Sequence, residues 1–244
     1  MSDVSVLRTG KRNAALDTIK WLAVISMVLD HLRYLWPSAD WLFVVGRLAF
    51  PLFCLAIAVN VVRLPRGSLI CEANTRYLAW LLVFSAISEL PYRWVSGSAT
   101  SASIMPTLML GLIVAWGAHY RTLEASLLAG LTLGLSLFLH AGLMYGVFGV
   151  LLPGTFVIAL KAKRLFWLLP ALVCVAANSR NRWVATENIE LFGWLIIGTA
   201  FVAPLMGALI MSRPVPYRIW PVTRWGYWFY PVHLAAIGVA RLLI

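Results

Sequence analysis

The sequence predicts an all-α fold: a polytopic transmembrane helix bundle of about nine spans, in a single domain over residues 1–244. Two observations lead to this class. The chain is 61% hydrophobic and only 12% charged, whereas a soluble domain is roughly half apolar and a quarter charged. The apolar residues also form successive runs of membrane-crossing length, separated by short loops.

A membrane-crossing helix needs about 20 mostly apolar residues. Measured against that length, the sequence predicts spans at 15–36, 42–62, 76–95, 104–120, 124–140, 142–160, 165–179, 190–211 and 225–243. The seventh run is short and contains Pro170, which breaks the helical pattern. It is therefore either a crossing helix or a re-entrant segment. Which of the two it is decides on which side of the membrane every later loop lies.

Basic residues gather in alternate loops and predict the orientation, because cytoplasmic loops carry the excess of Lys and Arg. The loops assigned to the cytoplasm contain Arg8, Lys11, Arg12, Arg63, Arg66, Arg76, Arg121, Lys161, Lys163, Arg164, Arg213, Arg218 and Arg224. The opposite loops contain mainly Arg93, Arg180 and Arg182, the last two near Glu187 and Glu190. The N-terminus is thus expected in the cytoplasm. The net charge of +11 indicates contact with anionic membrane lipids and no nucleic-acid partner, since no soluble element presents it to a duplex.

Three ionisable residues lie at the facing ends of the first two spans: Asp30, His31 and Arg47. Such groups in hydrocarbon cost at least ~2.5–3.5 kcal/mol each, so they indicate a site or a paired network. His31 lies eleven residues after Lys20, about 16 Å along a helix, and Arg47 falls at a similar depth. We therefore expect His31 and Arg47 to come together. Asp30 points about 100° away from His31 and is expected to pair elsewhere, Arg47 being one candidate.

His31 is the candidate general base, because a neutral imidazole accepts a proton near physiological pH. The alternative is that Asp30, His31 and Arg47 form a buried ion-pair network that only holds the helices together.

Further candidate residues lie in other spans. His233 has Tyr230 three residues before it on the same helix face, and is either a supporting hydrogen-bonder or a reactive group. Tyr145 supplies a hydroxyl group beside Gly146 and Gly149, two small residues that allow helices to approach closely.

Asn60, Lys20 and Arg63 lie near the cytoplasmic ends of the first two spans. Asn60 either contacts a ligand or caps a carbonyl. Because the chain lacks HExxH, CxxC and Walker patterns, we expect no metal and no nucleotide hydrolysis.

Several motifs resemble one known family. The opening LDTIKWLAVISMVLDHLRYL and WLFVVGRLAFPLFCLAIAVNVVR resemble the TraX family, which is linked to pilin N-acetylation in conjugative plasmid systems. MYGVFGVLL is similar to that family's internal Tyr-Gly motif, and FYPVHLAAIGVARLL to its last helix. The stretch SIMPTL, with Ser103 and Pro106, departs from the family's pattern and leaves the start of the fourth span open. The TrbP proteins of conjugation are a possible nearest branch.

The resemblance implies a membrane acyltransferase of the bacterial inner membrane, with acetyl-CoA as donor and a processed pilin as acceptor. It matches Asp30 and His31 to the family's Asp-His pair, and Arg47 to the Arg of its second motif. Tyr145 and His233 match its other two motifs.

With the donor that the resemblance implies, we expect Lys20, Arg63 and Asn60 to bind acetyl-CoA from the cytoplasm. His31 takes the proton of the acceptor amine at the outer side, and Arg47 stabilises the negative oxygen of the intermediate. Two alternatives remain: an O-acyltransferase acting on a glycan or lipid, and a non-enzymatic transport or scaffold component of a conjugation system.

Overall fold

The computed structural model describes residues 13–97, 100–185, 189–216 and 218–243, and these residues form helices joined by loops, with no strand among them. The expected all-α fold is confirmed. Arg8, Lys11, Arg12 and Glu187, used above for orientation, lie outside these residues. The helices are α2 (Ala14–Leu32), α3 (Leu42–Gly46), α4 (Ala49–Arg63), α5 (Glu72–Ser96), α6 (Ile104–Tyr120), α7 (Leu123–Phe138), α8 (Gly146–Lys161), α9 (Leu168–Asn178), α10 (Leu191–Ser212) and α11 (Trp225–Leu243), with short 3₁₀ turns η1 (Pro37–Ala39) and η2 (Arg164–Trp167).

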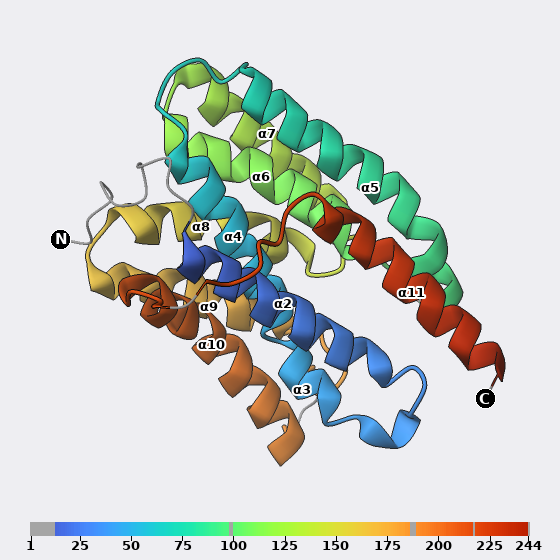
Figure 1. Cartoon of the computed structure of the whole chain (residues 1–244). Helices are drawn as coiled ribbons and strands as arrows, with labels where there is room; N and C mark the ends of the chain where they lie inside the picture. Colours follow the sequence, from blue (N-terminus) through green and yellow to red (C-terminus); the bar gives the residue numbers. More distant parts are fainter. Residues whose placement is uncertain (1–12, 98–99, 186–188, 217, 244) are drawn as a thin grey trace.

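Helices α2, α5 and α11 run in the same direction, although they are far apart in the sequence (Figure 1). Near its start, α2 is tied to the segment before α11 by the Trp21 indole, which donates a 2.8 Å hydrogen bond to the Trp220 carbonyl. Further along, Gly238 of α11 packs directly against the ring of Trp94 of α5. Helix α11 therefore lies beside both α2 and α5, and it brings the end of the chain to the opening helix.

The outer surface of the bundle is apolar. Large exposed hydrophobic side chains lie on several helices, among them Leu82, Leu90, Leu127, Leu131, Leu137, Leu191, Trp194, Val202, Leu209, Trp228 and Val232. Exposing such an apolar surface to water is unfavourable, whereas contact with lipid tails is not. The apolar helices therefore indicate association with a membrane.

By length and composition, two stretches of the described residues suffice to cross a membrane, Leu42–Arg63 and Leu191–Ser212. The apolar helices α6, α7 and α8 and the η2–α9 segment are shorter than that measure. The number of crossings and the orientation of the bundle stay predictions.

The second expected span is not one continuous helix. Its residues form α3 and α4, separated by a turn at Arg47 and Leu48. Pro51 accounts for the break, because it has no N–H to bond the Arg47 carbonyl four residues earlier and its ring crowds that carbonyl. Arg47 and Leu48 keep right-handed helical dihedrals, so α4 continues from α3 and Arg47 lies at the turn between them.

The seventh run also differs from its expected form. Pro170 does not break the helix: it lies in the first turn of α9, where a missing N–H leaves no hydrogen bond unmade. The 3₁₀ turn η2 leads directly into α9, and together they extend from Arg164 to Asn178.

Candidate functional site

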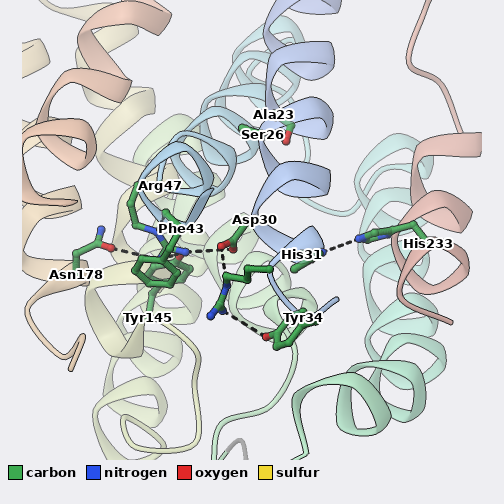
Figure 2. Close-up of polar contacts among 11 residues, drawn as sticks. Ala23, Ser26, Asp30, His31, Tyr34, Phe43, Arg47, Tyr145, Asn178 and His233 are labelled. Carbon is green, nitrogen blue, oxygen red and sulfur yellow. Dashed lines mark hydrogen bonds and ion pairs between the residues drawn. The ribbon is translucent and has the colours of Figure 1, made fainter. Parts of the chain in front are cut away.

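Arg47 is the centre of a buried polar cluster at the turn between α3 and α4 (Figure 2). Its guanidinium donates to the Phe43 carbonyl at 3.2 Å, to the Tyr145 hydroxyl at 2.9 Å and to the Asn178 amide oxygen at 3.4 Å. It also forms an ion pair with Asp30 at 3.3 Å. Residues of α2, α3 and α9 and the residue before α8 thus meet at one side chain, and the expected pairing of Asp30 with Arg47 is confirmed.

Asp30 is held in this cluster from two sides. Arg33, one turn further along the chain, donates to its other carboxylate oxygen at 3.1 Å. A Cβ at Gly46 would lie only 2.5 Å from Cβ and Cγ of Asp30. The absence of a side chain at Gly46 therefore allows α2 and α3 to approach closely enough for the Asp30–Arg47 ion pair.

Tyr145 enters the same cluster just before α8. Its ring stacks on Phe50 with centroids 4.1 Å apart and planes 6° apart. A Cβ at Gly149 would lie close to Thr107 and Phe50. The expectation that small residues near Tyr145 permit close helix approach is confirmed.

His31 makes a different contact, on α11. Its Nδ1 lies 2.6 Å from Nε2 of His233, and the two rings stack with centroids 4.9 Å apart and planes 18° apart. Nδ1 of His233 lies 2.9 Å from the Phe229 carbonyl oxygen, one turn earlier on α11. Tyr230 is close to both rings, with its centroid 6.3 Å from that of His31. Sequence reasoning selected both histidines but did not predict that they touch.

Among the described residues His31 and Arg47 make no direct contact, so the expectation that they come together holds only in that Arg47 lies near enough to act on the charge of His31. In Figure 2, Asp30 and Arg47 lie to one side of α2, whereas His31 points to His233 on the other side. The physical reason is the 100° step between adjacent helical positions, which directs Asp30 and His31 to different neighbours. Arg47 uses its donors on Phe43, Tyr145, Asn178 and Asp30. The Arg47 cluster thus ties the C-terminal end of α2 to α3, to α9 and to the residue before α8.

A cavity of about 140 Å³ lies between α2, α4, α5, α6 and α11. On α2 its wall is formed by Lys20, Val24 and Met27, which share one helix face, and His31 is the next residue along that face. Tyr230 and Ile104, the first residue of α6, line the cavity together with these residues. The cavity therefore follows this face of α2 as far as Met27, and His31, one turn further, is not among its lining residues.

Polar side chains line the other end of this cavity. Lys20 donates from Nζ to the Val222 carbonyl at 3.1 Å, and Asn60 hydrogen-bonds with Tyr77. Arg63, at the end of α4, lies near enough to Lys20 to act on its charge, although it does not line the cavity. Lys20 and Asn60 therefore lie at the polar end of the cavity, called its mouth below, and their expected role in binding a donor stays a prediction.

The unusual SIMPTL stretch forms a regular helix start. Helix α6 begins at Ile104, and the carboxylate of Glu89 accepts a 2.9 Å hydrogen bond from the Ser103 N–H. Negative charge at a helix N-terminus is favourable. The departure from the family pattern is thus accommodated by a side chain of α5.

Three residues of the site were missed in the sequence: Arg33, Tyr34 and Asn178. Arg33 is three positions after Asp30, a helical spacing that predicts an ion pair and was available as a signal. Tyr34 lies beside the site, its ring 6.0 Å from His31. Asn178 had no sequence signal, because its partner Arg47 is 131 positions away. No group of three or more His, Cys, Asp or Glu able to hold a metal occurs within the described parts of the chain.

Comparison with known proteins gives a match over most of the chain. The family model described as TraX protein matches residues 15–241. Two proteins named Protein TraX, from Escherichia coli and from its strain K12, are each 28% identical to this chain, covering 93% of it and 87% of their own length. An uncharacterized protein of Rickettsia prowazekii (strain Madrid E) is 38% identical over 55 residues, 22% of either chain. No solved structure matches.

Proposed function

The chain belongs to the TraX family, and we propose that it is a membrane acetyltransferase that uses cytoplasmic acetyl-CoA to N-acetylate a processed conjugative pilin at the outer side of the inner membrane. The observation that carries this proposal is the cavity that follows one face of α2 from Lys20 to Met27, with His31 as the next residue on that face. In this proposal a thioester bound along that face reaches the last turn of the cavity, one helical turn before the imidazole of His31.

The mouth suits the phosphates of acetyl-CoA. Lys20 supplies an ammonium and Asn60 an amide at the entrance, and Arg63 lies close to Lys20. Phosphate oxygens favour such cationic and hydrogen-bonding partners. Beyond the mouth the lining becomes apolar, with Val24, Ile57 and Leu108, which suits an uncharged arm that carries a thioester.

The reaction requires one base and one leaving group. The acceptor amine, once it has lost its ammonium proton, attacks the thioester carbonyl carbon and forms the new C–N bond. His31 removes the second proton from that nitrogen. The C–S bond then breaks, and the sulfur takes this proton from His31. The products are the N-acetylated acceptor and CoA thiol, and His31 is regenerated.

The negative oxygen of the intermediate needs a donor other than Arg47. Tyr230 is the better-placed candidate, because it lines the cavity and its ring lies 6.3 Å from His31. One well-aimed donor contributes ~3–4 kcal/mol to such an intermediate. In this scheme Asp30 and Arg47 hold the outer end of α2, and thereby the position of His31.

The test is acetyl transfer by the purified protein, with acetyl-CoA as donor and a peptide with a free N-terminal amine, representing the pilin, as acceptor. We expect a mass increase of one acetyl group and release of CoA thiol. His31→Gln should lower kcat by ~10²-fold or more, since a general base contributes about that much. The matched control is His140→Gln, remote from the cavity lining. Failure of the wild-type protein to transfer acetyl to any amine, glycan or lipid acceptor would overturn the proposal.

A further inference from the structure

The contact between His31 and His233 determines which nitrogen of His31 carries the proton. A neutral imidazole has one N–H donor and one acceptor nitrogen. Nδ1 of His233 lies 2.9 Å from the Phe229 carbonyl oxygen, and a carbonyl oxygen only accepts. Nδ1 of His233 therefore carries the hydrogen, and Nε2 of the same neutral ring is an acceptor.

The partner of that acceptor is Nδ1 of His31, at 2.6 Å. For this contact to be a hydrogen bond, Nδ1 of His31 must carry its own hydrogen and donate it. Nε2 of His31 is then left with a lone pair, and it has no hydrogen-bond partner among the described residues. That lone pair is what a general base needs.

The surroundings favour two neutral rings. Two positively charged side chains lie near His31: Arg33, two positions later in the chain, and Arg47. In the described part of the chain, no carboxylate makes an ion pair with His31 or His233. The other titratable groups beside the pair are Tyr34 and Tyr230, with Glu89 of α5 near Tyr230. An imidazolium here would be buried next to like charge, which is costly.

We infer that His233 is a positioning residue that holds His31 in the Nδ1–H tautomer, with the Nε2 lone pair free to take a proton from the acceptor. The chain of donors runs from His31 to His233 and on to the Phe229 carbonyl. When His31 gains a proton at Nε2, its Nδ1–H bond to His233 strengthens and stabilises the charged ring. This role rests on the proposed acetyl transfer and adds to it the group that orients the base.

The direct test is the tautomer itself. The protein is labelled with ¹⁵N-histidine in detergent micelles, and long-range ¹H–¹⁵N correlation spectra report which ring nitrogen carries hydrogen. His31→Gln assigns the signals of residue 31. We expect the Nδ1–H form of His31 in the wild-type protein, and a shift toward the Nε2–H form in His233→Leu. An Nε2–H form of His31 in the wild-type protein would refute the inference.

Two further variants separate hydrogen bonding from packing. His233→Gln keeps an acceptor oxygen within reach of Nδ1 of His31 and should preserve its tautomer. Phe229→Leu removes the ring that stacks on His233, with centroids 5.2 Å apart, but keeps the Phe229 carbonyl. It should also preserve the tautomer. If His233→Gln shifts the tautomer as far as His233→Leu does, the hydrogen bond is not what holds the ring.

Kinetics give the second readout. His233→Leu should lower kcat about 10²-fold with KM for acetyl-CoA little changed, and His233→Gln should recover most of that loss. Equal losses in kcat and equal rises in KM for both variants would indicate a structural role and contradict the inference. The spectra decide the tautomer even if the wild-type protein transfers no acetyl group, so the failure of the proposed function is distinguishable from the failure of this inference.

Discussion

Asp30 and His31 are adjacent in the chain and serve two different contacts. Asp30 pairs with Arg33 and Arg47, whereas His31 stacks on His233. The helix itself explains the separation, because successive side chains point about 100° apart. Asp30 and Arg47 therefore belong to the ion-pair network between the helices, and His31 does not. The proposed chemistry belongs to His31 and the cavity beside it.

The first prediction concerns Gly46. Gly46→Ala places a Cβ 2.5 Å from Asp30, so α2 and α3 must separate, and we expect a loss of about 1–3 kcal/mol in the free energy of unfolding. Denaturant unfolding in detergent micelles measures this change. The control is Gly130→Ala in α7, where nothing lies within 4 Å and alanine should be neutral or stabilising. Equal effects at the two positions would contradict the close contact.

The second prediction concerns the buried ion pair. Arg47→Met leaves the Asp30 carboxylate with Arg33 alone, and we expect unfolding to become easier by about 3 kcal/mol, the lower end of the cost of breaking a buried pair. Adding Asp30→Asn to the same protein should recover part of that loss, because it removes the uncompensated charge. A double-mutant cycle gives the coupling energy. Additive losses would show that the two side chains do not depend on each other.

At the scale of elements, the segment before α11 lies against α2 at the mouth of the cavity. Lys20 and Trp21 donate to the carbonyls of Val222 and Trp220, at 3.1 and 2.8 Å. Trp21 and Trp225 also contact each other, with ring centroids 5.5 Å apart. The opening helix and the last helix thus form one wall of the cavity together. In the proposed reaction, a change at the mouth should therefore affect binding of the donor rather than the chemical step.

The third prediction tests this mouth. Lys20→Gln removes a positive charge that faces the proposed phosphates. We expect the affinity for acetyl-CoA to fall about tenfold, which corresponds to a loss of about 1.4 kcal/mol in binding free energy. Calorimetric titration with acetyl-CoA measures the Kd. Arg76→Gln makes the same change in charge on α5, at an exposed ion pair with Glu72 outside the cavity lining. It should leave the Kd unchanged, and a similar fall in both variants would point to general electrostatic attraction.

For the whole molecule, the ends of the helices alternate between two poles of the bundle. At one pole Lys161 donates to the His119 ring, and Asn74 donates to the Tyr120 hydroxyl at 2.8 Å. At the other, Arg180 donates to the His140 carbonyl. Between the poles, leucines cover the outer faces. This arrangement suits a bundle that crosses a membrane several times.

The fourth prediction concerns that topology. In a protein whose three cysteines are replaced, a cysteine at Lys163 should react with a membrane-impermeant maleimide only after the cells are permeabilised. A cysteine at Arg182 should react in intact cells. The loops before and after α9 would then lie on opposite sides, as the nine-span prediction requires. Labelling of both positions from the same side would show that the η2–α9 segment is re-entrant.

Much of the fold was accessible from local pattern. The helices begin and end close to the expected spans, and the last one, Trp225–Leu243, coincides with its prediction. The breaks were harder to predict. Pro51 divides the second span, whereas Pro170 lies harmlessly in a first helical turn. The effect of a proline depends on where its helix begins, and apolar composition does not reveal that.

The sequence by itself determined that the chain is helical and apolar, and it singled out Asp30, His31, Arg47 and His233 as unusual polar residues in that setting. Only the tertiary structure decided the pairing. His31 and His233 are 202 positions apart and meet because α11 packs beside α2. Helical periodicity is a local property that states which residues share a face. Which face meets which neighbour depends on how all the helices pack at once.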